Sequence, residues 1–109
     1  MEVAFDSELL RSICEDQAVA TKELGAAVAE TLQRRLADLR AANAVSDLPT
    51  GHPRVSILEN DEYLLIDLSD GHVIALQANH RRNPIKNGGE LEWERVSRLK
   101  VIRIGRDND

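Results

Sequence analysis

The sequence is poor in aromatic residues, cysteine and long apolar runs, and each shortage excludes a class of protein. Its 109 residues include one Phe, one Tyr and one Trp, so a core must be built mainly from aliphatic side chains. The single cysteine excludes an internal disulfide. One thiol and three scattered histidines give no metal-ligand cluster, so we expect neither a metal nor another cofactor.

Long hydrophobic segments are missing as well. No apolar stretch approaches the roughly 18 to 20 residues of a membrane span, and the first residues lack the basic and apolar regions of a signal peptide. We therefore expect a cytoplasmic protein that does not contact a membrane. A chain of this length is expected to form a single domain, residues 1–109, around one modest core.

Charge is distributed unevenly along the chain. The net charge of −5 argues against a surface coated with positive charge for nucleic acid. Residues 1–78 carry 6 basic and 14 acidic side chains, whereas residues 79–106 carry 8 basic and 3 acidic ones. If the C-terminal third forms one surface, that surface could meet phosphates or an acidic partner; a solvated basic strand explains the same pattern equally well.

Helical periodicity occurs twice in the first half of the chain. Capping residues at Ser7 and Glu8 predict a short helix that runs to about residue 17 and places Cys14 in the core. A longer helix is predicted over residues 21–43, with Thr21 as its N-cap. Its apolar stripe consists of Leu24, Val28, Leu32, Leu36 and Leu39.

The second half of the chain changes to extended periodicity. Strands are predicted over residues 54–58, 63–68, 72–77 and about 96–104, and a short one over residues 1–5. Asp70-Gly71 predicts a tight hairpin turn, and a parity change in the last strand predicts a bulge near Val101. This order predicts an α+β fold with two N-terminal helices packed on one face of a small, mostly antiparallel sheet.

Three stretches of the sequence form a recognisable series. Residues 32–42 read LQRRLADLRAA and lead to Asp47-Leu48-Pro49, and residues 64–76 read LLIDLSDGHVIAL. The third stretch contains Asn79-His80, Asn83-Pro84, Lys86, Gly88-Gly89, Glu92-Trp93 and Arg95-Val96. In this order they resemble the RelE/ParE toxin superfamily, in particular the HigB-like killer proteins of bacterial plasmid maintenance systems, over nearly the whole chain.

The resemblance implies a partner and an activity. The partner is a cognate antitoxin, a small protein of helix-turn-helix type. Many members cleave messenger RNA on the ribosome, and others inhibit DNA gyrase, so the fold alone does not choose between these activities. Cleavage through the 2′-hydroxyl of RNA needs a base, an acid and a cation over the phosphate.

The residues for this chemistry are replaced in the sequence. The family has an arginine on its third sheet strand and a tyrosine–histidine pair near the C-terminus; the matching positions are Val73, Asp107 and Asn108. Valine cannot donate to a phosphoryl oxygen, and an aspartate repels RNA. Loss of one such donor costs about 10²- to 10³-fold in rate, so we expect an mRNA endonuclease activity that is weak or absent.

Other basic residues are candidates for the missing roles. His80 and Lys86 are candidate catalytic residues, although an exposed loop histidine is the simpler interpretation of His80. The candidate residues for binding RNA or a protein partner are Arg54, Arg81, Arg82, Arg98 and Lys100. Three hypotheses follow: a toxin-like protein with weakened nuclease activity, a noncatalytic protein-binding module of the same fold, and a nuclease that uses the replacement residues.

Overall fold

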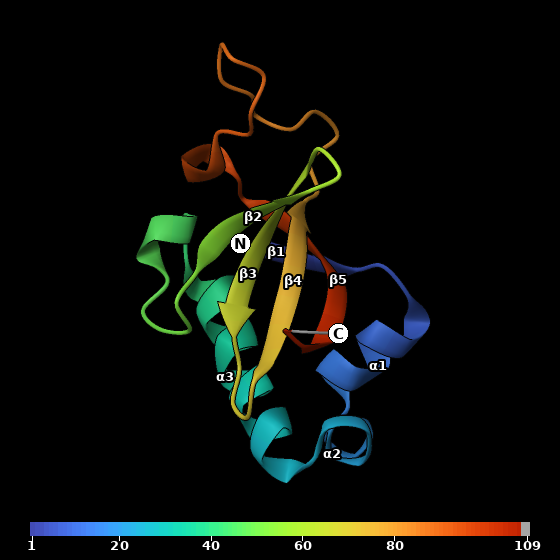
Figure 1. Ribbon diagram of the computed structural model, residues 1–109. Helices are drawn as coiled ribbons and strands as arrows, with labels where there is room; N and C mark the ends of the chain where they lie inside the picture. Colours follow the sequence, from blue (N-terminus) through green and yellow to red (C-terminus); the bar gives the residue numbers. More distant parts are fainter. Residues whose placement is uncertain (108–109) are drawn as a thin grey trace.

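The computed structural model describes residues 1–107 as a five-stranded sheet with helices on one of its faces (Figure 1). The strand order is β1-β5-β4-β3-β2. β1 pairs with β5 in parallel, and the other neighbouring strands are antiparallel. The elements in chain order are β1 (Glu2–Phe5), α1 (Glu8–Glu15), α2 (Gln17–Leu24), α3 (Ala26–Ala41), the 3₁₀ turn η1 (Val45–Asp47), β2 (Arg54–Leu58), β3 (Asp61–Asp67), β4 (His72–Ala78), the 3₁₀ turn η2 (Trp93–Arg95) and β5 (Arg98–Arg106).

The predicted α+β class is confirmed, but the prediction of two helices is wrong. The segment predicted as one long helix contains the second half of α2 and all of α3. The two helices are separate because Gly25 has a φ of +87° and interrupts the helical path. Thr21 therefore lies inside α2 and caps nothing. The carboxylate of Asp16 caps α2 by accepting backbone N–H groups of its first turn, which also ends α1 at Glu15.

The core lies between the helices and one face of the sheet. Cys14 is buried there, as predicted. The side chains that are at most 1% exposed include Leu32, Leu36 and Leu39 of α3 and Leu64, Ile66, Ile74, Leu76, Leu99 and Val101 of the sheet. Because this packing uses only one face, the other face of the sheet is left for other contacts. Within residues 1–107, no helix has both the length and the apolar character needed to cross a membrane.

The predicted bulge in the last strand is confirmed. Ala75 pairs with Arg103 while the next residue, Leu76, pairs with Val101, so Ile102 is the extra residue of β5. The bulge reverses the parity of the strand after Val101. As a result both Ile102 and Arg103 line the face opposite the helices.

Two tight turns fix the register of the antiparallel strands. Asp70 and Gly71 have φ values of 54° and 72°, which confirms the predicted hairpin turn between β3 and β4. Glu59 and Asn60, with φ values of 51° and 71°, form a second turn of the same kind between β2 and β3. The second turn was not predicted, because glutamate rarely adopts a positive φ.

Candidate functional site

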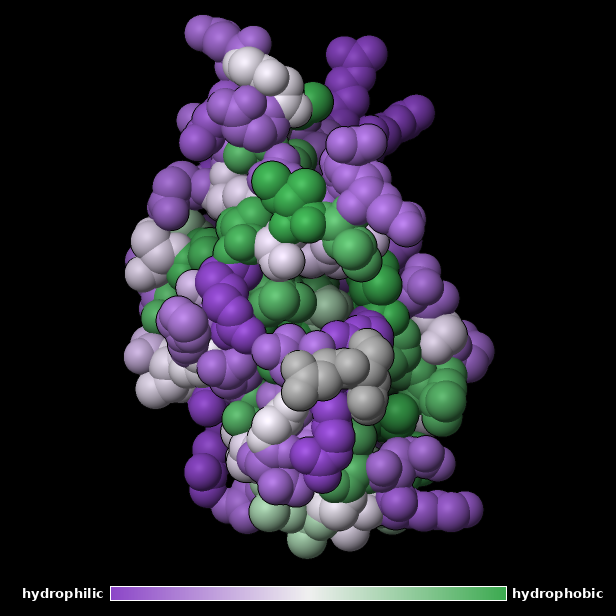
Figure 2. All heavy atoms as spheres, viewed as in Figure 1, coloured by the Kyte–Doolittle hydropathy of each residue, from purple (hydrophilic) through white to green (hydrophobic). Residues whose placement is uncertain are grey.

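The face of the sheet opposite the helices is open and holds a shallow cavity of about 360 Å³. Hydrophobic atoms gather on the upper part of this face, and polar atoms surround them (Figure 2). The lining residues are Ser56, Ile57, Leu58, Tyr63, Leu65, Ala75, Ile102, Arg103 and Asp107. The cavity therefore combines side chains from β2, β3, β4 and β5 with the residue that follows β5.

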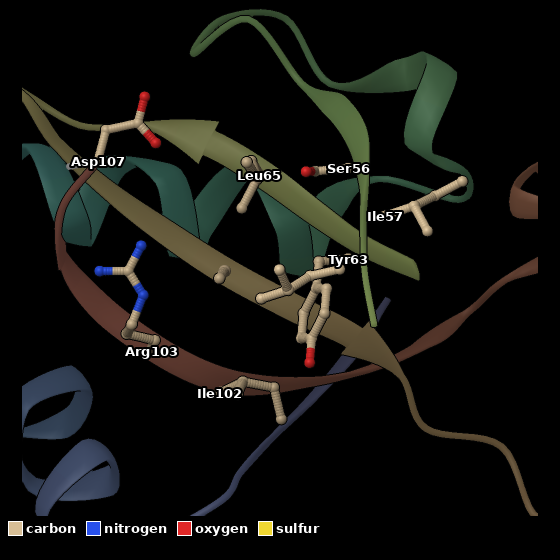
Figure 3. Close-up of a pocket in the computed structure, with 9 residues that line it drawn as sticks. Ser56, Ile57, Tyr63, Leu65, Ile102, Arg103 and Asp107 are labelled. Atoms are coloured by element: carbon tan, nitrogen blue, oxygen red, sulfur yellow. The ribbon is translucent and has the colours of Figure 1, made fainter. Parts of the chain in front are cut away.

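The cavity has an apolar floor and polar groups at its rim. Leu65, Ala75 and Ile102 come from three neighbouring strands and form the floor. Arg103 and Asp107 lie towards one end, and Tyr63 lies towards the other (Figure 3). A hydrophobic strip with one guanidinium and one carboxylate at its end is suited to an amphipathic segment of a protein, since such a segment has apolar and charged side chains to match.

Arg54 lies on this open face but is held by two carboxylates. Its Nη1 lies 3.0 Å from Oδ1 of Asp67, and its Nη2 lies 3.8 Å from Oδ2 of Asp107. Arg54 is placed opposite Leu65 in the β2–β3 pair, so its side chain shares the face of the cavity. A phosphate group would have to compete with both carboxylates for this guanidinium.

The predicted basic strand is largely neutralised by the N-terminal segment. Arg98 and Lys100 lie on the same face of β5, as the alternation predicted. The Nε of Arg98 lies 3.0 Å from Glu2, and the Nζ of Lys100 lies 3.5 Å from Asp6. The parallel pairing of β1 with β5 thus brings acidic residues from one end of the chain to basic residues at the other.

The candidate residues of the loop after β4 lie apart from the cavity. The loop rises beyond the end of the sheet (Figure 1). Arg81, Arg82 and Lys86 are exposed, and none of the three lines the cavity within residues 1–107. The backbone N–H of Ser97 donates to Nε2 of His80 at 3.0 Å. His80 therefore joins the start of the loop to the start of β5, and the lone pair that a base would use is already engaged.

The far end of the same loop is fastened to the sheet by Glu62 of β3. Its Oε2 accepts the backbone N–H of Leu91 at 2.6 Å, and its Oε1 accepts the indole N–H of Trp93 at 3.1 Å. Trp93 also packs against the hydrophobic core. One carboxylate thus holds both the backbone and the side chain at the loop's end.

We expect Glu62→Ala to release this end of the loop. Loss of two hydrogen bonds to a charged acceptor is expected to cost about 2 kcal/mol of folding free energy. Trp93 is the only tryptophan, so its fluorescence emission should shift to longer wavelength as the indole becomes hydrated. Glu90→Ala, which removes an exposed carboxylate from the same loop, is the control. An unchanged emission maximum in Glu62→Ala would contradict the anchoring role.

The positions matched to the family's catalytic residues do not form a cationic site. Val73 of β4 is 2% exposed and lies opposite Asp67 and Gly105 on the face of the cavity. Asp107 adds a negative charge to that face, while Asn108 lies outside the described residues. The part of the chain that the structure describes contains no group of three or more His, Cys, Asp or Glu side chains placed to hold a metal ion.

Tyr63 was not singled out for this site from the sequence, and Arg103 was considered only as one of the basic residues on the last strand. Both lie on the cavity face. Tyr63 could have been found from strand alternation, because it occupies the opposite parity to the core residues Leu64 and Ile66. Arg103 was harder to place, because its direction depends on the bulge at Ile102.

Comparisons with known proteins provide no relative for this chain. No protein-family model matches it, and searches of curated proteins and of solved structures return no significant match.

Proposed function

We propose that this chain is a toxin-like component of a bacterial type II toxin–antitoxin module whose RNA-cleaving activity is weak or lost and whose binding to a partner protein is retained. The assignment to such a module is based on the sequence resemblance to the RelE/ParE toxin superfamily. The loss of activity rests on one observation above all: a buried valine, Val73, occupies the position where the family has its arginine. A valine side chain can neither donate a hydrogen bond nor carry charge to a phosphate.

The electrostatics of the open face also favour protein binding over RNA binding. Arg54 and Arg98 are engaged by carboxylates at 3.0 Å, and Lys100 lies 3.5 Å from Asp6. RNA would have to displace these carboxylates or accept their repulsion, which lowers the gain from each phosphate contact. An apolar partner segment would not have to displace any carboxylate to bind the floor of the cavity. Covering the floor removes apolar surface from water, which favours binding.

The proposed occupant of the cavity is a segment of the antitoxin with apolar side chains and an acidic residue near Arg103. Arg103 lines the cavity and donates to the backbone carbonyl of Arg106, a neutral partner that leaves its positive charge uncompensated by that contact. A carboxylate from the partner would form a charge-assisted hydrogen bond there. The alternative hypothesis, a noncatalytic binding module that contacts a protein partner through its basic strand and a helix groove, predicts binding without toxicity.

Induction of the chain in a bacterial host tests the loss of activity. We expect growth to continue and transcripts to stay intact, while an active toxin of the superfamily, induced in parallel, arrests growth and cuts messages. Rapid arrest with cleaved transcripts would overturn this half of the proposal. In that case His80→Ala and Lys86→Ala would show whether the replacement residues carry the cleavage.

Co-expression with the protein encoded by the neighbouring reading frame tests the binding. We expect the two proteins to purify together, and we expect Arg103→Glu to weaken the complex at least about tenfold by repelling the acidic residue of the partner. Arg82→Glu is the matched control, because it makes the same charge reversal on the loop, away from the cavity. Loss of the complex in Arg82→Glu, with Arg103→Glu unaffected, would place the interface on the loop and overturn the assignment to the cavity.

A further inference from the structure

The edge strand β2 exposes an unusual amount of apolar surface. Of the five large apolar side chains that are exposed within residues 1–107, three belong to its five residues: Val55 at 44%, Ile57 at 70% and Leu58 at 63%. Proteins usually protect such an edge with lysine, proline or a bulge inside the strand. β2 contains none of these, and it pairs with β3 in unbroken register.

The unpaired backbone groups of β2 can be identified from the turn that follows it. Leu58 and Asp61 flank the two-residue turn and exchange hydrogen bonds, so Ser56 and Arg54 also direct their backbone groups towards β3. The N–H and C=O groups of Val55 and Ile57 therefore face away from the sheet. In Figure 3 the side chains of Ser56 and Ile57 project to opposite sides of the strand, as this alternation requires.

We propose that β2 pairs antiparallel with β2 of a second copy of this chain, on a two-fold axis at Ser56. In this register Val55 of one copy faces Ile57 of the other, so that the outward backbone groups of both residues find partners in two reciprocal pairs. Ser56 faces its own symmetry mate. The result is one sheet continuous across both copies, and the exposed side chains of Val55 and Ile57 cover one another.

The charges at the strand are compatible with this pairing. Arg54 is the only charged residue of β2, and in the proposed register it lies opposite Leu58 of the other copy. The two arginines are therefore at opposite ends of the contact and do not repel each other. Glu59 lies opposite Pro53 of the other copy, next to that copy's Arg54, so opposite charges are neighbours at both ends.

The size of the contact sets the expected strength. A stable interface buries more than about 1,000 Å² of surface in total. The area buried by one pair of five-residue strands is at the lower end of the range for known interfaces. We therefore expect a reversible dimer with a dissociation constant in the micromolar range. This inference does not depend on the proposed function. Ile57 belongs both to the edge strand and to the cavity lining, but Val55 does not line the cavity and Arg103 does not lie on β2. Val55→Lys therefore tests the dimer, and Arg103→Glu tests the cavity.

Sedimentation velocity on the full chain over a series of concentrations tests the dimer. We expect a monomer–dimer equilibrium that Ile57→Lys weakens at least about tenfold, because the substitution places a charge on the edge. Val55→Lys is a second variant with the same expected effect, and far-ultraviolet circular dichroism checks that each variant folds. Leu9→Lys is the control that should leave the dimer intact, because Leu9 lies on α1, away from β2, and is already 57% exposed.

Disulfide trapping tests the register. With Cys14 replaced by alanine, Ser56→Cys should form a covalent dimer under a mild thiol oxidant, since facing residues of a non-hydrogen-bonded pair have Cα atoms about 4.5 Å apart. Ser97→Cys, an exposed residue away from β2, should not. A chain that stays monomeric, a dimer that survives Ile57→Lys, or an absence of trapping at position 56 would each overturn the proposal. If the chain is monomeric but Val55→Lys, outside the cavity lining, abolishes capture of the neighbouring gene's protein, the edge of β2 is instead the site of that partner.

Discussion

Gly51→Ala is expected to destabilise the protein by about 3 to 5 kcal/mol and to lower its melting temperature by roughly 15 to 25 °C. Gly51 has a φ of +89°, which costs a residue with a side chain free energy by itself. A Cβ atom at this position would also lie 2.5 Å from Cγ2 of Ile66 and 2.8 Å from Nε of Arg35. Ile66 is buried in the core and has no room to move.

Gly51 lies where the helical layer and the sheet meet. Its carbonyl accepts the backbone N–H of Asp67 at 2.6 Å, and Arg35 of α3 donates to the carbonyl of Asp67 at 2.9 Å. The loop, the helix and β3 therefore meet at this point. Thermal and chemical denaturation measure the effect.

Gly89→Ala is the matched control for Gly51→Ala. Gly89 has a similar φ of +94°, but a Cβ atom there would meet no atom within 4 Å. Its substitution should cost only about 1 kcal/mol, from backbone strain alone. Equal losses of stability in the two variants would show that the clash with Ile66 is relieved and that it does not determine the cost of Gly51→Ala.

Cys14 is expected to make stability depend on pH in the alkaline range. Burial raises the pKa of the Cys14 thiol from its ordinary value of 9.0 to about 11, and the nearby Arg40 opposes part of this rise. Between these values the unfolded chain loses the thiol proton while the folded chain keeps it. Stability should therefore fall as the pH rises from about 9 to 11, by about 2 to 3 kcal/mol in total, and the full contribution should be present below pH 9.

Urea denaturation at a series of pH values measures this effect, with Cys14→Ala as the reference. The variant has no thiol to titrate, so the difference between the two stability curves isolates Cys14 from other groups that titrate in the same range. The thiol should also react with alkylating reagents only as fast as the protein opens. A constant difference between the curves from pH 8 to about pH 11 would contradict the assigned pKa.

Those parts of the fold whose secondary structure follows from side-chain periodicity were predicted correctly. The alternating strands, the turn at Asp70-Gly71 and the bulge near Val101 follow from local pattern. The break between α2 and α3 was not recognised, because the apolar residues keep their helical spacing across Gly25. Backbone conformation, and not the hydrophobic pattern, divides that segment.

The candidate site was less predictable, because it depends on pairing between distant segments. The basic residues Arg98 and Lys100 were identified, but their partners Glu2 and Asp6 were not. Only the position of β1 beside β5 makes these pairs possible. The cavity likewise needs the register of β2 to β5 before its lining can be assembled.

The pairing of β1 with β5 has a consequence for how the chain folds. Residues 2–5 pair with residues 98–101, so β1 can join the sheet only when a segment more than 90 residues away in the sequence is present. Contacts of such large sequence separation slow folding, because a long loop must be ordered first. During synthesis the helices and the β2–β4 meander can form early, but β1 can pair only after residues 98–101 have left the ribosome.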